Sequence, residues 1–291
     1  MIGHVLSAAV VFAGVMWLYS GVLSSLVTQW ASDDNYSHGF LIVPLALYCA
    51  WERRHLLAAA ERRPRISGLV IVLISLFVYA IGVLAAELFL TRISLVGVVA
   101  GTVLFVWGSA HARELVFPLA LLPLMVPLPA LVFNQVAFPL QLLASRVGET
   151  ALATAHIPVL REGNILELPN TTLAVAEACS GIRSLISLVT LAVVLAYFTE
   201  RRAVARILIV LSAVPIAILA NAARVAGTGF ASHWFGPKAA EGFFHGFSGW
   251  IMFAVAFAGL VVVGRVIGRI SMPWAVRWRR AAEEDQCSPA H

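Results

Sequence analysis

The fold class follows from the run Ser67-Gly-Leu-Val-Ile-Val-Leu-Ile-Ser-Leu-Phe-Val-Tyr-Ala-Ile-Gly-Val-Leu-Ala-Ala-Glu87, in which only the last residue is charged. Further apolar runs of roughly 18 to 22 residues recur along the chain, close to the length that crosses a hydrocarbon core about 30 Å thick. Of its 291 residues, 60% are hydrophobic and 12% are charged, about half the charge of a soluble domain. The mean hydropathy is +0.90. The sequence therefore predicts an all-α integral membrane protein.

Eight membrane-spanning helices are predicted, and together they form a polytopic bundle. One bundle accounts for nearly the whole length, so we expect a single domain over residues 1–291, with a charged tail at 270–291. The first span is interpreted as a retained helix, because its apolar core is too long for a signal peptide and no Lys or Arg precedes it. Four prolines break the fifth. The expected spans are residues 5–27, 37–52, 67–87, 92–109, 113–131, 180–198, 204–225 and 246–268.

The arginines orient this bundle. With eight spans, fourteen of the twenty basic residues fall on one side and six on the other. An excess of Lys and Arg marks the cytoplasmic side, so both termini are expected to be cytoplasmic and the opposite face to be outside. The net charge of +5 is explained by this topology signal, and no nucleic-acid partner is expected.

Two segments on the opposite, outer side are more than simple loops. Residues 131–155 carry apolar side chains at spacings of three and four, which predicts an amphipathic helix in the outer interface; the alternative is a helix packed on the bundle. Residues 159–175 alternate polar with apolar positions, and their turn signals are Gly163-Asn164 and Pro169-Asn170. They predict one or two small strands, resembling a β-hairpin, over the outer face.

The three cysteines, Cys49, Cys179 and Cys287, are dispersed along the chain. An odd number with this spacing does not indicate a disulfide framework or a metal site. No Cys-x-x-Cys or His-Glu-x-x-His pattern and no Gly-rich phosphate loop occurs. We therefore expect neither a metal nor a cofactor.

Cys179 lies in the peptide Glu177-Ala-Cys-Ser-Gly-Ile-Arg183, where the irregular outer segment turns into the sixth span. A free cysteine in a membrane protein is most often a small buried hydrophobe. Here Ser180-Gly181 offers a helix start, and the partial positive charge of a helix N-terminus stabilises a thiolate. Arg183 follows four residues later, on the same helical face. These features favour a reactive thiolate.

Two polar residues of the later spans reach the same outer face. Arg224, in Asn221-Ala-Ala-Arg224, ends the seventh span, and His245 precedes the eighth. An arginine suits a carboxylate or an oxyanion, and a histidine suits general acid–base chemistry. The alternatives are a snorkelling arginine and an interfacial histidine without a partner. His233 is a weaker candidate, because Trp234-Phe235 beside it is typical of an aromatic belt.

In these segments the chain resembles the exosortase/archaeosortase family of membrane cysteine transpeptidases. The resemblance rests on Glu177-Ala-Cys-Ser-Gly-Ile-Arg-Ser184, Asn221-Ala-Ala-Arg224 and Phe244-His-Gly-Phe247, and it covers most of residues 35–270. Pro127-Leu-Pro129 and the Asn and Gln residues that follow are similar to the bacterial exosortase A type.

The resemblance implies a catalytic set of Cys179 as nucleophile, Arg224 and His245, with Arg183, Asn221 and Glu177 in supporting roles. It implies substrates that are exported proteins with a C-terminal sorting tail: a Pro-Glu-Pro signature, a transmembrane helix and a basic cluster. Cleavage would pass through a Cys179 thioester to water, an amine or a glycolipid, in connection with exopolysaccharide or surface assembly. Two other functions remain open, an anion transporter and a scaffold subunit of polysaccharide export.

Overall fold

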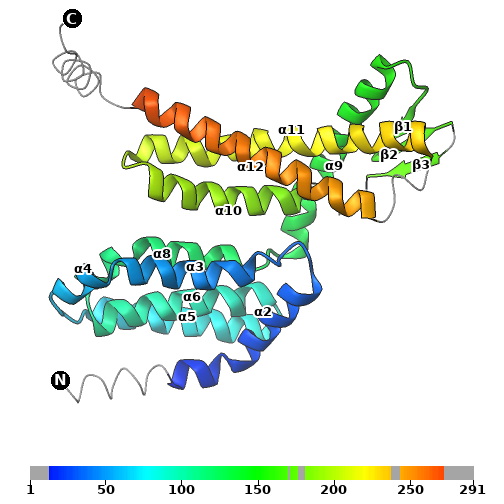
Figure 1. Cartoon of the computed structure of the whole chain (residues 1–291). Helices are drawn as coiled ribbons and strands as arrows, with labels where there is room; N and C mark the ends of the chain where they lie inside the picture. Colours follow the sequence, from blue (N-terminus) through cyan, green and yellow to red (C-terminus); the bar gives the residue numbers. More distant parts are fainter. Residues whose placement is uncertain (1–12, 170, 176–180, 237–242, 272–291) are drawn as a thin grey trace, which may run out of the picture. The chain divides into compact units, whose positions relative to one another are not determined.

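The computed structural model describes residues 13–169, 171–175, 181–236 and 243–271 (Figure 1). Its contacts divide the chain into two compact units, Met1–Phe133 and Asn134–His291, and each is described by itself. The single domain expected from the sequence stays a prediction, because this division does not test whether either unit folds alone.

Helices that suit a membrane dominate both units. Within the described residues, five helices are long and apolar enough to cross a bilayer, and the number is six if the bent pair Val116–Met125 and Ala130–Thr154 counts as one span. The predicted polytopic helical fold is confirmed, whereas the count of eight spans is approximate. The first predicted span lies partly outside the described residues. The second forms a helix of only 14 residues, and the proline-rich fifth divides into short pieces because proline breaks helices.

The first unit is organised around the helix pair α5 and α6, whose backbones touch at glycines. A methyl group added to Gly68 would lie 2.2 Å from the backbone nitrogen of Phe105, so only glycine fits there. Close approach at small residues is how membrane helices gain packing energy. The elements of this unit are α2 (Ser20–Ser32), α3 (Gly39–Glu52), α4 (Arg54–Ala59), α5 (Ile66–Leu84), α6 (Leu88–Val106), α7 (Ser109–Glu114), α8 (Val116–Leu121) and the 3-10 helix Leu122–Met125.

The second unit holds α9 (Ala130–Thr154, most of it in this unit), α10 (Ile182–Thr199), α11 (Ala203–Phe235) and α12 (Phe243–Ser271). Helices α10, α11 and α12 pack side by side (Figure 1). Along α11, every fourth residue from Ala205 to Gly229 is buried, and most of these residues are small. This stripe packs against alanines and leucines of α10 and α12 and lets the helices approach closely.

A three-stranded antiparallel sheet precedes α10, one strand more than the hairpin that the sequence predicted. Its strands are β1 (Leu160–Glu162), β2 (Ile165–Leu168) and β3 (Thr171–Ala174), in the order β1-β2-β3. Gly163 has a φ of +64° in the turn from β1 to β2, as a two-residue hairpin turn requires. Leu166 and Leu168 point from β2 into a core shared with α9 and α11.

Helix α9 confirms the helix expected over residues 131–155, and its position favours the alternative packing on the bundle. Leu152 is fully buried, and its side chain contacts Gly229 of α11. Ser145 donates a hydrogen bond to the Gly163 carbonyl, and Arg161 of β1 pairs with Glu149 at 2.7 Å. One side of α9 therefore holds the sheet, and the interfacial location stays a prediction.

Helix α11 is longer than predicted: it continues ten residues past Val225, to Phe235. Val225 and Phe230 pack into the core beneath the sheet, which stabilises the extension despite Gly227 and Gly229. With 33 residues, α11 is about 50 Å long and exceeds the hydrocarbon core. Arg224 consequently lies within a helix, not at its end.

Replacing Leu166 by alanine should lower the free energy of unfolding by about 2–5 kcal/mol, because it empties a fully buried site under the sheet. Chemical unfolding of the detergent-solubilised protein, followed by tryptophan fluorescence, measures the change. Ile165→Ala, on the exposed face of the same strand, is the matched control and should cost about 1 kcal/mol or less. Equal losses in the two variants would contradict the packing described.

Candidate active site

Of the six predicted site residues, some lie outside the described part of the chain and the others are placed on helices α10, α11 and α12. Glu177 and Cys179 lie outside the described residues. Arg183 is the second residue of α10, and Asn221 and Arg224 lie one turn apart on α11. His245 lies in the first turn of α12, where the backbone is described and the side chain is not. The sequence placed His245 before its helix; the helix instead begins at Phe243.

Helix α10 begins close behind Cys179, as Ser180-Gly181 predicted. Gly181 is the N-cap residue, with a φ of +76°, and its carbonyl accepts the first helical hydrogen bond from Leu185 at 2.8 Å. Left-handed backbone of this kind favours glycine. Cys179 therefore lies two residues before an N-cap in the sequence, and a helix N-terminus carries a partial positive charge.

Asn221 packs against this N-cap. A methyl group on Gly181 would lie 2.6 Å from Cγ and 2.9 Å from Nδ2 of Asn221, so the side chain amide lies directly on the glycine backbone. Asn221 is buried because it continues the small-residue stripe of α11. The contact ties the start of α10 to the middle of α11.

The chain that leads to Cys179 is held at its other end by Asn164. The backbone nitrogen of Val175 donates to the Asn164 carbonyl at 2.8 Å, and Nδ2 of Asn164 donates to the Val175 carbonyl at 3.1 Å. Val175 and Gly181 flank residues 176–180. Both ends of the segment that contains Cys179 are therefore attached to the same unit.

Arg224 extends from α11 toward α12. A methyl group on Gly249 would lie 3.3 Å from Cζ of Arg224 and 3.4 Å from Nη2, so the guanidinium group lies against Gly249. Residues four apart on a helix share a face, and His245 precedes Gly249 by four. Arg224 therefore contacts the face of α12 that carries His245.

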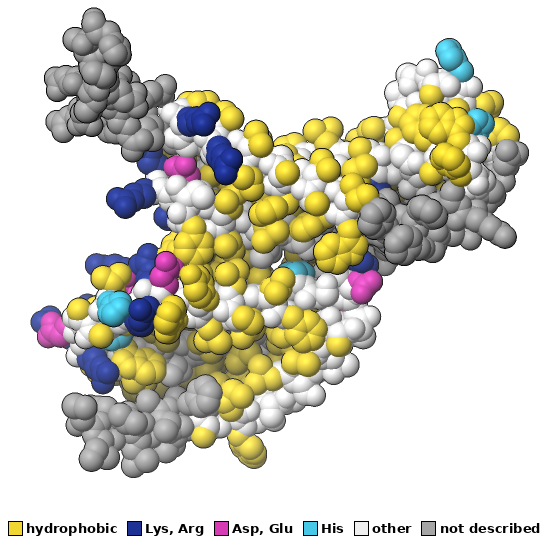
Figure 2. Space-filling view, in the orientation of Figure 1, with side chains coloured by type: hydrophobic (Ala, Val, Ile, Leu, Met, Phe, Trp, Pro, Cys, Tyr) yellow, Lys and Arg dark blue, Asp and Glu magenta, His cyan; other side chains and the backbone are white. Residues whose placement is uncertain are grey.

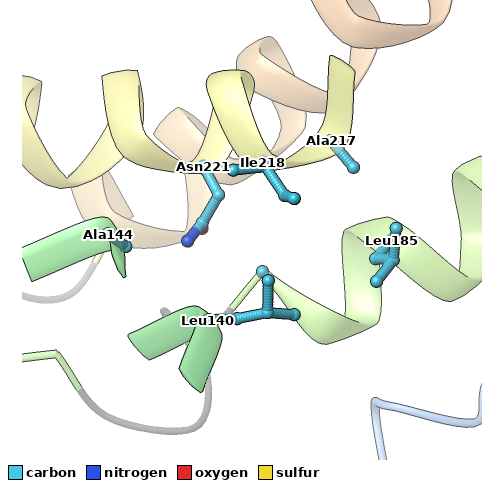
Figure 3. A pocket seen from close by; sticks show the side chains of 7 residues that line it. Leu140, Ala144, Leu185, Ala217, Ile218 and Asn221 are labelled. Carbon is cyan, nitrogen blue, oxygen red and sulfur yellow. The ribbon is translucent and has the colours of Figure 1, made fainter. Parts of the chain in front are cut away.

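Two small cavities of about 10 Å³ each adjoin Asn221, and each has room for about one water molecule. The first lies between the Asn221 side chain, Gly181 and residues of α9 (Figure 3). The second is lined by Asn221, Arg224, Ser184 and Gly249. The turn of α11 from Asn221 to Arg224 thus lies between the start of α10 and the first turns of α12.

Arg183 is half-buried, and its Nε atom, like that of Arg224, is shielded from solvent. A guanidinium group that is partly shielded from solvent favours an anionic ligand or transition state. Among the described residues, no three His, Cys, Asp or Glu side chains are grouped to hold a metal ion. The expectation of a metal-free site stays a prediction, because Cys179 and the His245 side chain lie outside the described part of the chain.

Two residues of this site were not singled out from the sequence. Gly249 supports the Arg224 guanidinium, and Ser184 lines the cavity beside it. The sequence could have indicated Gly249, because it follows His245 by four residues and residues four apart share a helix face. His233, the weaker histidine candidate, belongs to the last turn of α11; the predicted span ended at residue 225 and left it in the following loop.

Gly181→Ala should destabilise the protein by about 1–3 kcal/mol, because the methyl group meets Asn221 and alanine disfavours a φ of +76°. The free energy of unfolding in detergent measures this loss. Gly227→Ala is the control: nothing lies within 4 Å of its added methyl group, and alanine suits a helix better than glycine. A Gly181→Ala variant as stable as Gly227→Ala would refute the described N-cap.

The chain was compared with known protein families, curated sequences and solved structures. No curated protein sequence and no solved structure gives a significant match. Residues 30–262 match the family of transmembrane exosortases. The matched range includes the start of α10, the Asn221–Arg224 turn and the first turns of α12, and it covers well over half of the 291 residues. The chain belongs to the transmembrane exosortase family.

Proposed function

We propose that this exosortase is a membrane cysteine protease and transpeptidase that removes the C-terminal sorting tail of exported proteins. The observation that carries the proposal is the position of one turn of α11. Its Asn221 touches Gly181, two residues after Cys179, and its Arg224 touches Gly249, one turn after His245. This turn, which is one of the three segments of the family resemblance, therefore contacts the first segment at Gly181 and reaches α12 two residues beyond the third.

The proposed reaction has two acyl-transfer steps. The Cys179 thiolate attacks the carbonyl carbon of the scissile peptide bond, and Arg224 stabilises the oxyanion. The C–N bond then breaks, His245 gives a proton to the leaving amine, and a Cys179 thioester remains. Water, an amine or a glycolipid hydroxyl attacks the thioester, His245 takes the proton of that acceptor, and the thiolate leaves.

We assign supporting roles to Asn221, Arg183 and Glu177. Asn221 contacts the N-cap glycine, so it fixes the start of α10, which follows Cys179 closely in the chain. Arg183, in the first turn of α10, adds positive charge beside the thiolate. Glu177 would orient neighbouring cations.

The substrate we propose is a protein with a Pro-Glu-Pro signature, a transmembrane helix and a basic end. Its helix lies along the bundle in a bacterial inner membrane, with the basic end in the cytoplasm. That orientation puts the scissile bond at the periplasmic face, where the proposed catalytic residues are expected. Both termini of the enzyme are then cytoplasmic, as the arginine distribution predicts.

Cys179→Ser should abolish thioester formation, and Arg224→Ala and His245→Ala should slow processing by about 10²–10³-fold and 10²–10⁴-fold. The measurement is gel separation of a tagged substrate with a Pro-Glu-Pro tail, co-expressed with each variant. Enzyme abundance in the membrane is checked in parallel.

Cys287→Ser and His233→Ala are the matched controls, since they remove the same residue types outside the proposed site, and both should process normally. Trapping of an acyl-enzyme on wild-type Cys179 would support the mechanism directly. Unchanged processing by abundant Cys179→Ser enzyme would overturn it and favour a scaffold or transporter.

Gly249→Ala should lower kcat roughly tenfold with little change in KM, because the added methyl group displaces a guanidinium group needed in the transition state. Gly259→Ala, on the same helix, is the control: its methyl group would lie 3.9 Å from Ile216, an ordinary contact. Steady-state processing of a purified substrate in detergent gives both constants. Equal kcat values for the two variants would exclude a positioning role for Gly249.

A further inference from the structure

An open groove lies at the end of the second unit farthest along α10 from Gly181. It has a volume of about 670 Å³ and is formed where α10 ends, α11 begins and α12 approaches its end. With 18 residues, α10 separates it from the proposed catalytic residues by about 27 Å. Its volume lies within the range of small-molecule sites. The groove is therefore separate from the site described above.

Four arginines surround the groove. Arg201 and Arg202 form the connection between α10 and α11, while Arg265 and Arg269 are one turn apart on α12. All four side chains are exposed. Figure 2 shows Lys and Arg side chains gathered at this end of the three helices. The groove thus concentrates positive charge from two separate parts of the chain.

The walls below these arginines are apolar and open. Leu195 and Val261 line them together with Gly264 and Gly268 of α12. The Leu195 side chain packs against Gly264, and the Glu200 side chain lies against Gly268. The rings of Tyr197 and Phe198 lie at the same end of α10, 5.3 Å apart, and aromatic residues favour the level of lipid headgroups. An apolar wall beneath a cationic rim suits a ligand that is itself amphipathic.

The charges inside the groove do not cancel. Glu200 is the one carboxylate among its lining residues, and its Oε1 is directed at Gly268, 2.2 Å from where a methyl group would stand. Within the described residues, no carboxylate forms an ion pair with Arg201, Arg202 or Arg265. Arg206 differs from them: its Nε donates to the Glu200 carbonyl at 2.8 Å and caps α10.

We propose that this groove is a binding site for an anionic phospholipid. The headgroup phosphate accepts hydrogen bonds from the forked guanidinium groups, and an acyl chain lies on the wall formed by Leu195 and Val261. Basic pockets between membrane helices on the cytoplasmic side bind such headgroups, and the arginine count predicts that this end is cytoplasmic. The orientation of the protein in the membrane explains why arginines lie on this side, but it does not explain why they surround a groove.

The test compares phosphatidylglycerol with phosphatidylcholine on the full-length protein. Lipid retained after detergent exchange is counted by native mass spectrometry, and the gain in melting temperature on adding lipid is measured. Wild-type protein should retain phosphatidylglycerol in preference to phosphatidylcholine. The triple variant R201Q/R202Q/R265Q should reduce this preference by on the order of a hundredfold. Each arginine near the membrane surface contributes about 1 kcal/mol of attraction to an anionic headgroup, and the three together correspond to about two factors of ten in affinity.

The matched control is R62Q/R65Q/R113Q, which removes three exposed arginines predicted to lie on the same side but outside the groove. It should keep the preference of the wild type. Equal losses in the two triple variants would show a diffuse charge effect and overturn the proposal. So would an absence of preference in the wild type, which is the result expected if the acidic stretch Glu283-Glu284-Asp285 filled the groove.

Inorganic phosphate, added alone, separates the headgroup from the whole lipid. The proposal predicts that millimolar phosphate does not raise the melting temperature as phosphatidylglycerol does, because phosphate cannot use the apolar wall. An equal rise with phosphate would overturn the lipid assignment in favour of a free-anion site. Comparing the gain on addition, not the melting temperature itself, separates ligand binding from any structural loss in the variants.

Discussion

A bilayer offers the polypeptide backbone no hydrogen-bond partners, and the rest of this structure depends on that constraint. Long apolar segments become helices because a helix satisfies its own N–H and C=O groups. The non-helical chain between α9 and α10 needs another solution. Its residues 160–162, 165–168 and 171–174 form a three-stranded sheet in which the strands pair their backbone groups, and the sheet packs on α9 and α11. The same core and a hydrogen bond to Asn164 hold Val175, the last described residue before the segment that contains Cys179.

Small residues determine where the polar side chains meet. The buried stripe of α11 brings its backbone close to α10 and α12, and Asn221 interrupts the stripe at the level of the α10 N-cap. Arg224 follows one turn later and reaches Gly249. A buried amide and a half-buried guanidinium are expensive in an apolar setting. Because burying these two groups costs stability, their presence in one turn, between two segments predicted to be catalytic, favours a functional role.

Much of the fold was predictable from hydropathy. The helices α5, α6, α10 and α12 begin and end within a few residues of the expected spans, because an apolar run of that length has no other stable form in lipid. Errors arose where tertiary contacts outweigh local sequence. Helix α11 runs on through two glycines because Val225 and Phe230 pack beneath the sheet, and residues 159–175 form three strands because Leu166 and Leu168 share that core.

For the candidate site, the sequence alone determined the residue types and their order: a cysteine before a helix, an arginine and a histidine in later helices, and the family to which they belong. Only the tertiary structure decided that Asn221 rests on Gly181 and that Arg224 rests on the helix face of His245. The groove rimmed by Arg201, Arg202 and Arg265 is also a tertiary feature. The physical reason is the same in each case. Hydropathy and helix periodicity act within one segment, whereas contacts between segments depend on which small residues let two helices come together.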